Sequence, residues 1–202
     1  MLENYLKYLA FLNKNFDEFF LSQKPYIFCK KGCGLCCKNA EFPYSKMEFT
    51  YLISGLKSLD KQTVAVVLAN IHKVISLKKQ NKQPKFLYDC PFLIDDVCSV
   101  YPYRGIVCRT FGLLSVGKNG NVKIPFCSSM GLNYSNILDE EKGQLSSELL
   151  AKTGYKEKPV GFNIEYDFIT DKKFEEKFGF VFGDKKPLID WLEEALAFDF
   201  NQ

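Results

Sequence analysis

The sequence has one histidine, one tryptophan and three methionines among 202 residues, and it contains no long apolar run. A membrane-spanning helix needs roughly 18 or more consecutive apolar residues, but Lys7, Lys14, Asp17 and Glu18 interrupt even the apolar beginning of the chain. Glu3 stands where a signal peptide would carry positive charge, and no small-residue cleavage site follows. We therefore expect no membrane span and a cytoplasmic location.

The usual enzyme motifs are also missing. With a single histidine, a Ser-His-Asp or Cys-His mechanism has little support, and no paired carboxylates stand near the cysteines. Residues 112–119 resemble a phosphate loop, but Asn119 replaces the Ser or Thr that would hold magnesium. His72 lies within one turn of an apolar stripe and precedes Lys73, so we place it at the edge of that stripe rather than in a site.

Charge is unevenly distributed along the chain. Residues 1–89 contain 14 basic and 7 acidic side chains, whereas residues 128–202 contain 9 basic and 15 acidic ones. The lysines of the basic part are scattered, which is typical of solvated helix faces, and we expect no nucleic-acid binding. The acidic part is a candidate surface for a protein partner.

Local patterns predict helices at both ends of the chain and short strands between them. Apolar residues at helical spacing predict a helix over 2–21, and the capping box of Ser45 and Glu48 begins another that reaches about Leu59. Asp60 is the expected cap of a third helix. Tight turns are expected at Asp95-Asp96 and at Asn119-Gly120, the second between strands at 112–117 and 121–126. Further helices are expected near 139–152, 171–178 and 187–198, and Trp191 of the last is expected in the core.

These patterns predict an α+β fold. N-terminal helices and a small antiparallel sheet would surround a cysteine-ligated metal centre in residues 1–127, and the motifs lie in 26–127. Residues 128–202 would form an acidic helical extension packed on that domain.

All 8 cysteines lie between Cys29 and Cys127. In a reducing compartment such clustering is typical of metal ligands or redox groups rather than of disulfides. Four thiolates suit either zinc or an iron-sulfur cluster. Because neighbouring side chains on an extended segment point to opposite faces, the adjacent Cys36 and Cys37 indicate either two sites or one ligand beside a buried or reactive thiol.

A family resemblance follows from the order of these motifs. The run Cys33-Gly-Leu-Cys36-Cys37, followed by CPFL from Cys90, C-x-x-Y from Cys98 and R-x-x-x-CR from Arg104, resembles the CxxCxxCC or YkgJ-like family of zinc- or iron-chelating domains over residues 26–127. Flagellin lysine N-methylases belong to the same broad group. The resemblance implies that the metal ligands are Cys29, Cys33, Cys36, Cys37, Cys90, Cys98 and Cys108, with Cys127 as the eighth.

Two positions depart from the family pattern. Three residues separate Cys29 from Cys33 where the family name has two, which puts the role of Cys29 in doubt. Gly105 follows Arg104 where the family usually has proline. The spacing of Cys29, Cys33 and Cys36 also matches radical S-adenosylmethionine enzymes, but Leu35 replaces their usual aromatic residue and no repeated βα pattern follows.

The residues next to the cysteines carry positive charge. Four thiolates around Zn²⁺ or a 2+ iron-sulfur core leave a net charge near −2, which Arg104 and Arg109 are placed to offset. We expect a metalloprotein that holds an iron-sulfur cluster or zinc, with a structural or electron-transfer role. The alternatives are an iron-sulfur oxidoreductase, an enzyme similar to the flagellin N-methylases, and a zinc-stabilised interaction module.

Overall fold

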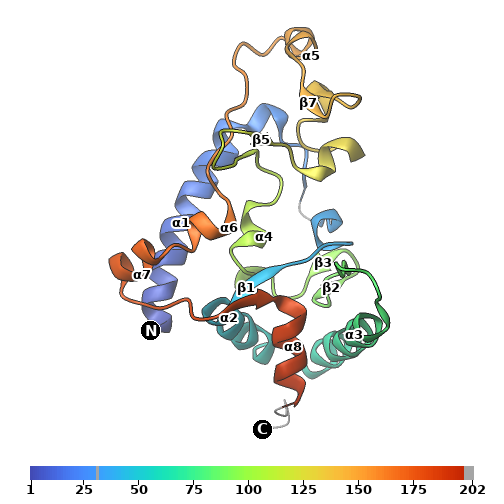
Figure 1. The fold of residues 1–202 in the computed structure, drawn as a ribbon, viewed down its shortest axis with the longest axis vertical. Coiled ribbons are helices and arrows are strands. Elements are labelled where there is room, and N and C mark those ends of the chain that lie inside the picture. The colour runs from blue at the N-terminus through green and yellow to red at the C-terminus, as the bar shows by residue number, and fades with distance from the viewer. Residues whose placement is uncertain (31, 198–202) are drawn as a thin grey trace.

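The computed structural model describes residues 1–30 and 32–197. The predicted N-terminal helix is confirmed as α1 (Leu2–Ser22), which buries one face that includes Tyr5, Tyr8 and Phe16. This face packs in an aromatic cluster with Phe180 and Phe182 from the C-terminal part. Figure 1 shows α1 along one side of the molecule, next to the short helices α6 (Tyr166–Ile169) and α7 (Lys172–Phe178).

Three helices enclose the main apolar core at one end of the molecule (Figure 1). They are α2 (Lys46–Lys57), α3 (Lys61–Gln80) and α8 (Leu188–Ala197). The predicted caps are confirmed, because Ser45 and Glu48 form a capping box and the Asp60 side chain accepts from the amide of Thr63. Within the described residues, no helix has the length and apolar character that crossing a membrane requires.

In the described residues, the strands form four separate antiparallel pairs rather than the one small sheet expected from the sequence. Three are local hairpins, and the fourth joins segments far apart in the chain. The pairs are β1 (Pro43–Ser45) with β8 (Lys185–Pro187), β2 (Leu93–Ile94) with β3 (Val97–Cys98), β4 (Ser115–Val116) with β5 (Val122–Lys123), and β6 (Leu138–Asp139) with β7 (Gln144–Leu145).

Both predicted turns form, whereas one predicted helix forms only in part. Asp95 and Asp96 have positive φ angles of 48° and 62° in the β2–β3 turn, as a tight hairpin requires. The hairpin around Asn119-Gly120 also forms, with strands shorter than expected. The helix predicted near 139–152 is wrong in its first half, because residues 138–145 form the β6–β7 hairpin and α5 covers only Ser147–Thr153. Residue 198 of the last predicted helix lies outside the described part.

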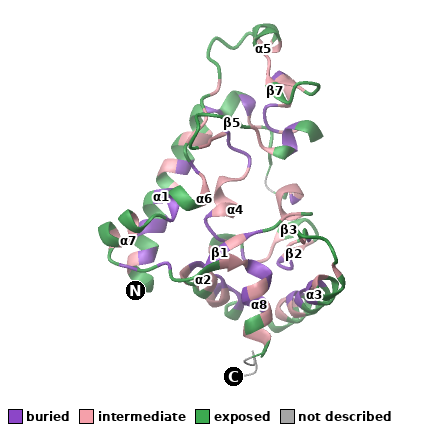
Figure 2. Ribbon diagram, in the orientation of Figure 1, coloured by how far each residue is buried: buried purple, intermediate pink, exposed green. Residues whose placement is uncertain are grey.

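Several single turns complete the chain. They are the 3₁₀ turns Lys24–Tyr26, Leu35–Cys37, Tyr101–Tyr103, Phe126–Met130 and Ser135–Ile137, and the short helix α4 (Val107–Thr110). Residues after 127 contribute to every buried cluster, and Trp191, 7% exposed, lies in the core as expected. In Figure 2 the buried residues gather where α2, α3 and α8 meet and along the inner side of α1.

Candidate metal centre

The first four cysteines lie on a loop that packs against the β2–β3 hairpin. Cys36 and Cys37 belong to a single 3₁₀ turn, Leu35–Cys37, in which the amide of Cys37 donates to the carbonyl of Gly34 at 2.9 Å. A Cβ atom at Gly34 would lie 3.0 Å from the carbonyl oxygen of Asp96, so a side chain there would crowd the hairpin and glycine favours this close approach. The two adjacent cysteines are therefore on a tight turn, not on the extended segment assumed from the sequence.

Backbone pairing then brings later cysteines beside this turn. The amide of Cys90 donates to the carbonyl of Cys37 at 2.8 Å. Ala40 and Tyr88 form an antiparallel bridge in which the amide of each residue donates to the carbonyl of the other. Cys98 pairs with Leu93 in the β2–β3 register, and the amide of Leu93 donates to the carbonyl of Cys90. Three parts of the cysteine pattern that are distant in sequence thus meet in one region.

Cys108 approaches the same region from α4. Its Sγ atom lies 3.6 Å from the hydroxyl of Tyr44, a fully buried residue of β1. The backbone just before α4 is held by two side chains, since the amide of Gly105 donates to Tyr44 Oη and the amide of Ile106 donates to Glu48 Oε1, both at 2.8 Å. The start of α2 therefore fixes the position from which Cys108 projects.

We call Cys36, Cys90, Cys98 and Cys108 the inner cysteines. Burial raises the pKa of Cys90 well above its usual value, and the charges of Cys108, Cys98 and Cys36 raise it further. Burial raises the pKa of Cys108 to about 12, although the hydrogen bond with Tyr44 acts in the opposite direction and lowers this pKa. The hydrogen bond with Cys37, together with burial, raises the pKa of Cys36. The sulfurs are close enough to disfavour one another's thiolates, a repulsion that a bound cation would reverse.

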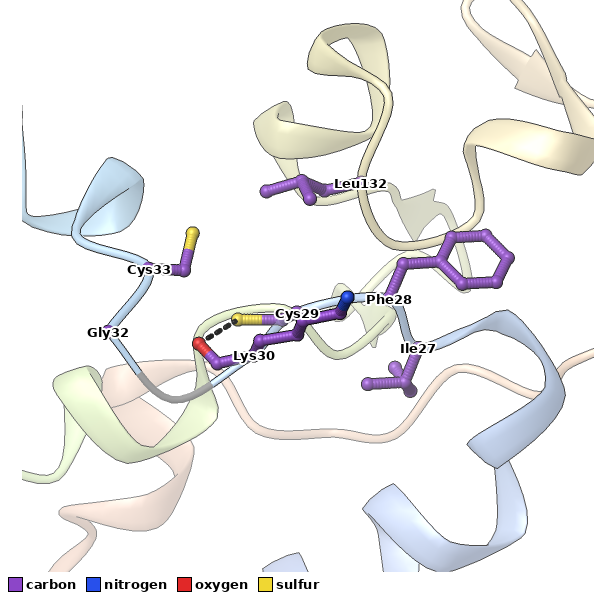
Figure 3. Close-up of a pocket in the computed structure, with 7 residues that line it drawn as sticks. All are labelled: Ile27, Phe28, Cys29, Lys30, Gly32, Cys33 and Leu132. Atoms are coloured by element: carbon purple, nitrogen blue, oxygen red, sulfur yellow. Dashed lines mark hydrogen bonds between the residues drawn. The ribbon is translucent and has the colours of Figure 1, made fainter.

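We call Cys29, Cys33 and Cys127 the outer cysteines. Burial raises the pKa of Cys29 to about 11, and the neighbouring Cys33 adds to the shift. Burial also raises the pKa of Cys127, helped by the charge of Cys36. Cys36 is thus a neighbour of both groups. Cys29 and Cys33 line an open depression of about 720 Å³, shown in Figure 3, where the Cys29 thiol points to the carbonyl of Lys30.

The two arginines named from the sequence lie in different settings. The positive charge of Arg104 lowers the pKa of Cys36, Cys98 and Cys108, which places its guanidinium beside the inner cysteines. Its Nε and Nη1 atoms are buried without a hydrogen-bond partner among the described residues. Arg109 instead donates to the carbonyls of Pro102 and Arg104 and to the side chain of Asn13. Arg109 therefore holds the loop that carries Arg104.

Thiols are suitable ligands for a thiophilic metal, but the cysteine side chains in the described part of the chain are not arranged to bind one ion. All eight cysteines are free thiols, and exposed His72 on α3 is not part of the group. Among the described residues, no three Cys, His, Asp or Glu side chains are arranged so that they could hold one metal ion. An anionic metal-thiolate centre would supply the charge that the buried Arg104 donors lack.

Two further residues of the site carry no sequence signal. Asn133 is fully buried, and its Oδ1 atom accepts the amides of Phe28 and Cys29, both at 2.8 Å, while its Nδ2 atom donates to the carbonyl of Gly112. It therefore fixes the start of the cysteine loop. Tyr44 lies outside every motif and was not expected at the site. Only tertiary contacts identify these two side chains.

The fold gathers the cysteines of this chain in one region, as expected of a metal-chelating protein. The family model CxxCxxCC, described as a "putative zinc- or iron-chelating domain", matches residues 28–128, which is half of the chain and contains every cysteine. The chain belongs to this family, as the resemblance predicted. Comparison with curated proteins and with solved structures gives no match.

Proposed function

We propose that this chain is an iron-sulfur protein that transfers electrons, with its cluster held by the inner cysteines. The observation that carries the proposal is the environment of these four residues. The four cysteines come from three separate segments of the chain. Cys90, Cys98 and Cys108 pack against the main apolar core, and Cys36 is a neighbour of the other three. An apolar setting with one half-buried cation, Arg104, suits a centre whose charge changes by one electron.

The lack of histidine among the clustered donors favours iron-sulfur over a single zinc ion. A structural zinc site uses four ligands, often with histidine among them. Here seven cysteines belong to the inner or the outer group, and the only histidine, His72, lies outside both groups. A cluster, when bound, supplies a reversible one-electron couple. Arg104 then offsets negative charge at the inner cysteines. Cys29 and Cys33 line the open depression, which gives a redox partner access to that side of the site.

Anaerobic purification tests this proposal. The protein should be brown, contain iron and acid-labile sulfide in similar amounts, and bleach on reduction with dithionite. Cys98→Ser should lose the colour, while Ser99→Ala, which removes only a hydroxyl that donates to the carbonyl of Phe92, should keep it. A colourless anaerobic preparation with stoichiometric zinc and no sulfide would overturn the proposal and leave a structural zinc site.

A small cavity supports a second candidate, an iron-sulfur oxidoreductase. Cys36 and Cys127 both line a cavity of about 230 Å³ whose other walls are mostly apolar and include Phe111, Leu113 and Phe126. A small apolar substrate in this cavity would contact the cysteine groups directly. Leu113→Trp, which fills the cavity, should abolish turnover of such a substrate and leave the iron content unchanged. The cytoplasmic location and a partner at the acidic residues 128–202 stay predictions.

A further inference from the structure

The hydroxyl of Tyr44 stands between the backbone before α4 and the sulfur of Cys108. Its oxygen accepts the amide of Gly105 at 2.8 Å and lies 3.6 Å from Cys108 Sγ. In the free thiol form, either the sulfur or the hydroxyl can donate. A metal-bound cysteine sulfur has no proton, so in the loaded protein the Tyr44 O–H group is the donor and the sulfur the acceptor.

We propose that Tyr44 is a positioning residue for the metal centre, whose O–H···S hydrogen bond to Cys108 stabilises negative charge on that ligand. This inference rests on the proposed function. Hydrogen bonds to ligating sulfurs are among the features that set the reduction potential of an iron-sulfur centre. The bond becomes stronger when an added electron increases the charge on the sulfur, so it favours the reduced state and raises the potential.

Gly105 is the second residue that the position of the Tyr44 hydroxyl depends on. A Cβ atom at position 105 would lie 2.5 Å from Cζ and 2.9 Å from the hydroxyl oxygen of Tyr44. The close approach of the phenol thus requires glycine, and the bond to the hydroxyl requires an amide proton, which proline lacks. One of the two positions where this chain departs from the family pattern, Gly105, is therefore the one that admits the Tyr44 hydroxyl.

The fold offers a matched control for the hydroxyl. Tyr88 is also buried in the main core, and its hydroxyl likewise accepts one backbone amide, that of Ile189 at 3.2 Å. No hydrogen bond joins the Tyr88 hydroxyl to a sulfur among the described residues. Tyr44→Phe and Tyr88→Phe each remove one buried hydroxyl and leave one amide without its acceptor, but only the first removes a hydrogen bond to a cysteine sulfur.

The test is a redox titration of the full-length anaerobic protein, followed by visible absorption. We expect Tyr44→Phe to shift the one-electron equilibrium about tenfold toward the oxidised state, which equals about 59 mV, and Tyr88→Phe, which removes no hydrogen bond to sulfur, to shift it much less. Gly105→Ala, whose methyl group would displace the Tyr44 ring, should shift the equilibrium in the same direction. Equal potentials in Tyr44→Phe and Tyr88→Phe would overturn the inference while leaving the iron-sulfur proposal intact.

If the anaerobic protein carries zinc instead, the iron-sulfur proposal fails but the role of Tyr44 is still measurable. Competition for Zn²⁺ with a chromophoric chelator should then show an affinity about tenfold lower for Tyr44→Phe than for Tyr88→Phe. Equal Zn²⁺ affinities in these two variants would overturn the inference.

Discussion

Glu48 is the buried group whose replacement should affect the fold and the site together. Its Oε2 atom accepts the Ser45 amide at 2.9 Å and the Ser45 hydroxyl at 2.7 Å, and it also accepts the hydroxyl of Tyr166. Its Oε1 atom accepts the amide of Ile106. One carboxyl thus joins the start of α2, the segment before Cys108 and helix α6 of the C-terminal part.

Glu48→Gln keeps the shape but replaces one acceptor with an NH₂ donor. The hydroxyls of Ser45 and Tyr166 can rotate, but the Ser45 or the Ile106 amide must lose its partner. One buried unsatisfied amide costs about 1–3 kcal/mol. At about 2–4 °C per kcal/mol for a chain of this size, the thermal midpoint should fall by roughly 2 to 12 °C. Exposed Glu176→Gln is the control and should change stability by less than about 0.5 kcal/mol.

A pH series separates the charge of Glu48 from its hydrogen bonds. Burial raises the pKa of Glu48 above its usual 4.5, although the surrounding donors oppose the shift. The native state therefore binds this proton more tightly than the unfolded state does. The stability of the wild type relative to Glu48→Gln should be greatest below pH 4.5 and fall as pH rises through the raised pKa. Urea unfolding at several pH values measures this difference, and a difference independent of pH would refute the reasoning.

Three other substitutions test the core and the centre. Cys108→Ser should lose bound metal and, because metal-thiolate bonds supply folding free energy, melt at a lower temperature than the wild type; an unchanged melt and metal content would exclude Cys108 as a ligand. Gly55→Ala places a methyl group into the ring of Tyr103 and should cost about 1–3 kcal/mol in urea unfolding, so a neutral effect would contradict this packing. Trp191→Phe removes the indole N–H that donates to the carbonyl of Tyr44 at 3.0 Å and should cost about 1 kcal/mol, which a thermal melt unchanged from the wild type would contradict.

Local chemistry made part of the fold predictable. The capping box at Ser45 and the turns at Asp95-Asp96 and Asn119-Gly120 depend on residues within a few positions of one another, and all of them form. The helix predicted from residue 139 failed for an equally local reason. Gly143 has a φ of 61°, and the Asp139 side chain accepts the amide of Lys142, which closes a hairpin turn. Apolar spacing alone did not reveal this turn.

The family was predictable from the sequence, but the arrangement of the cysteines was not. Cysteine clustering and motif order identified the metal-chelating family, because ligand chemistry is a property of residue type. The central place of Cys36 between the inner and outer cysteines depends on the bridge between Ala40 and Tyr88 and on the bond from Cys90 to Cys37. Such pairings join residues about 50 positions apart, which no local pattern specifies. Tyr44 and Asn133 were missed for the same reason.

The pairing of β1 with β8 leads to a last prediction, about residues 1–127 alone. This fragment contains every cysteine but lacks the partner strand of β1 and the α8 side chains Leu188, Ile189, Trp191 and Leu192, which are buried in the main core. At about 1.5–3 kcal/mol for each buried side chain, these four contribute about 6–12 kcal/mol, comparable to the entire stability of a typical domain, about 5–15 kcal/mol. We therefore expect the fragment to lack a cooperative melt and to bind a hydrophobic dye, whereas the control fragment 1–197, which retains α8, should melt like the full chain. A cooperative melt of residues 1–127 within a few degrees of the full chain would show instead that α8 is an appendage rather than part of the core.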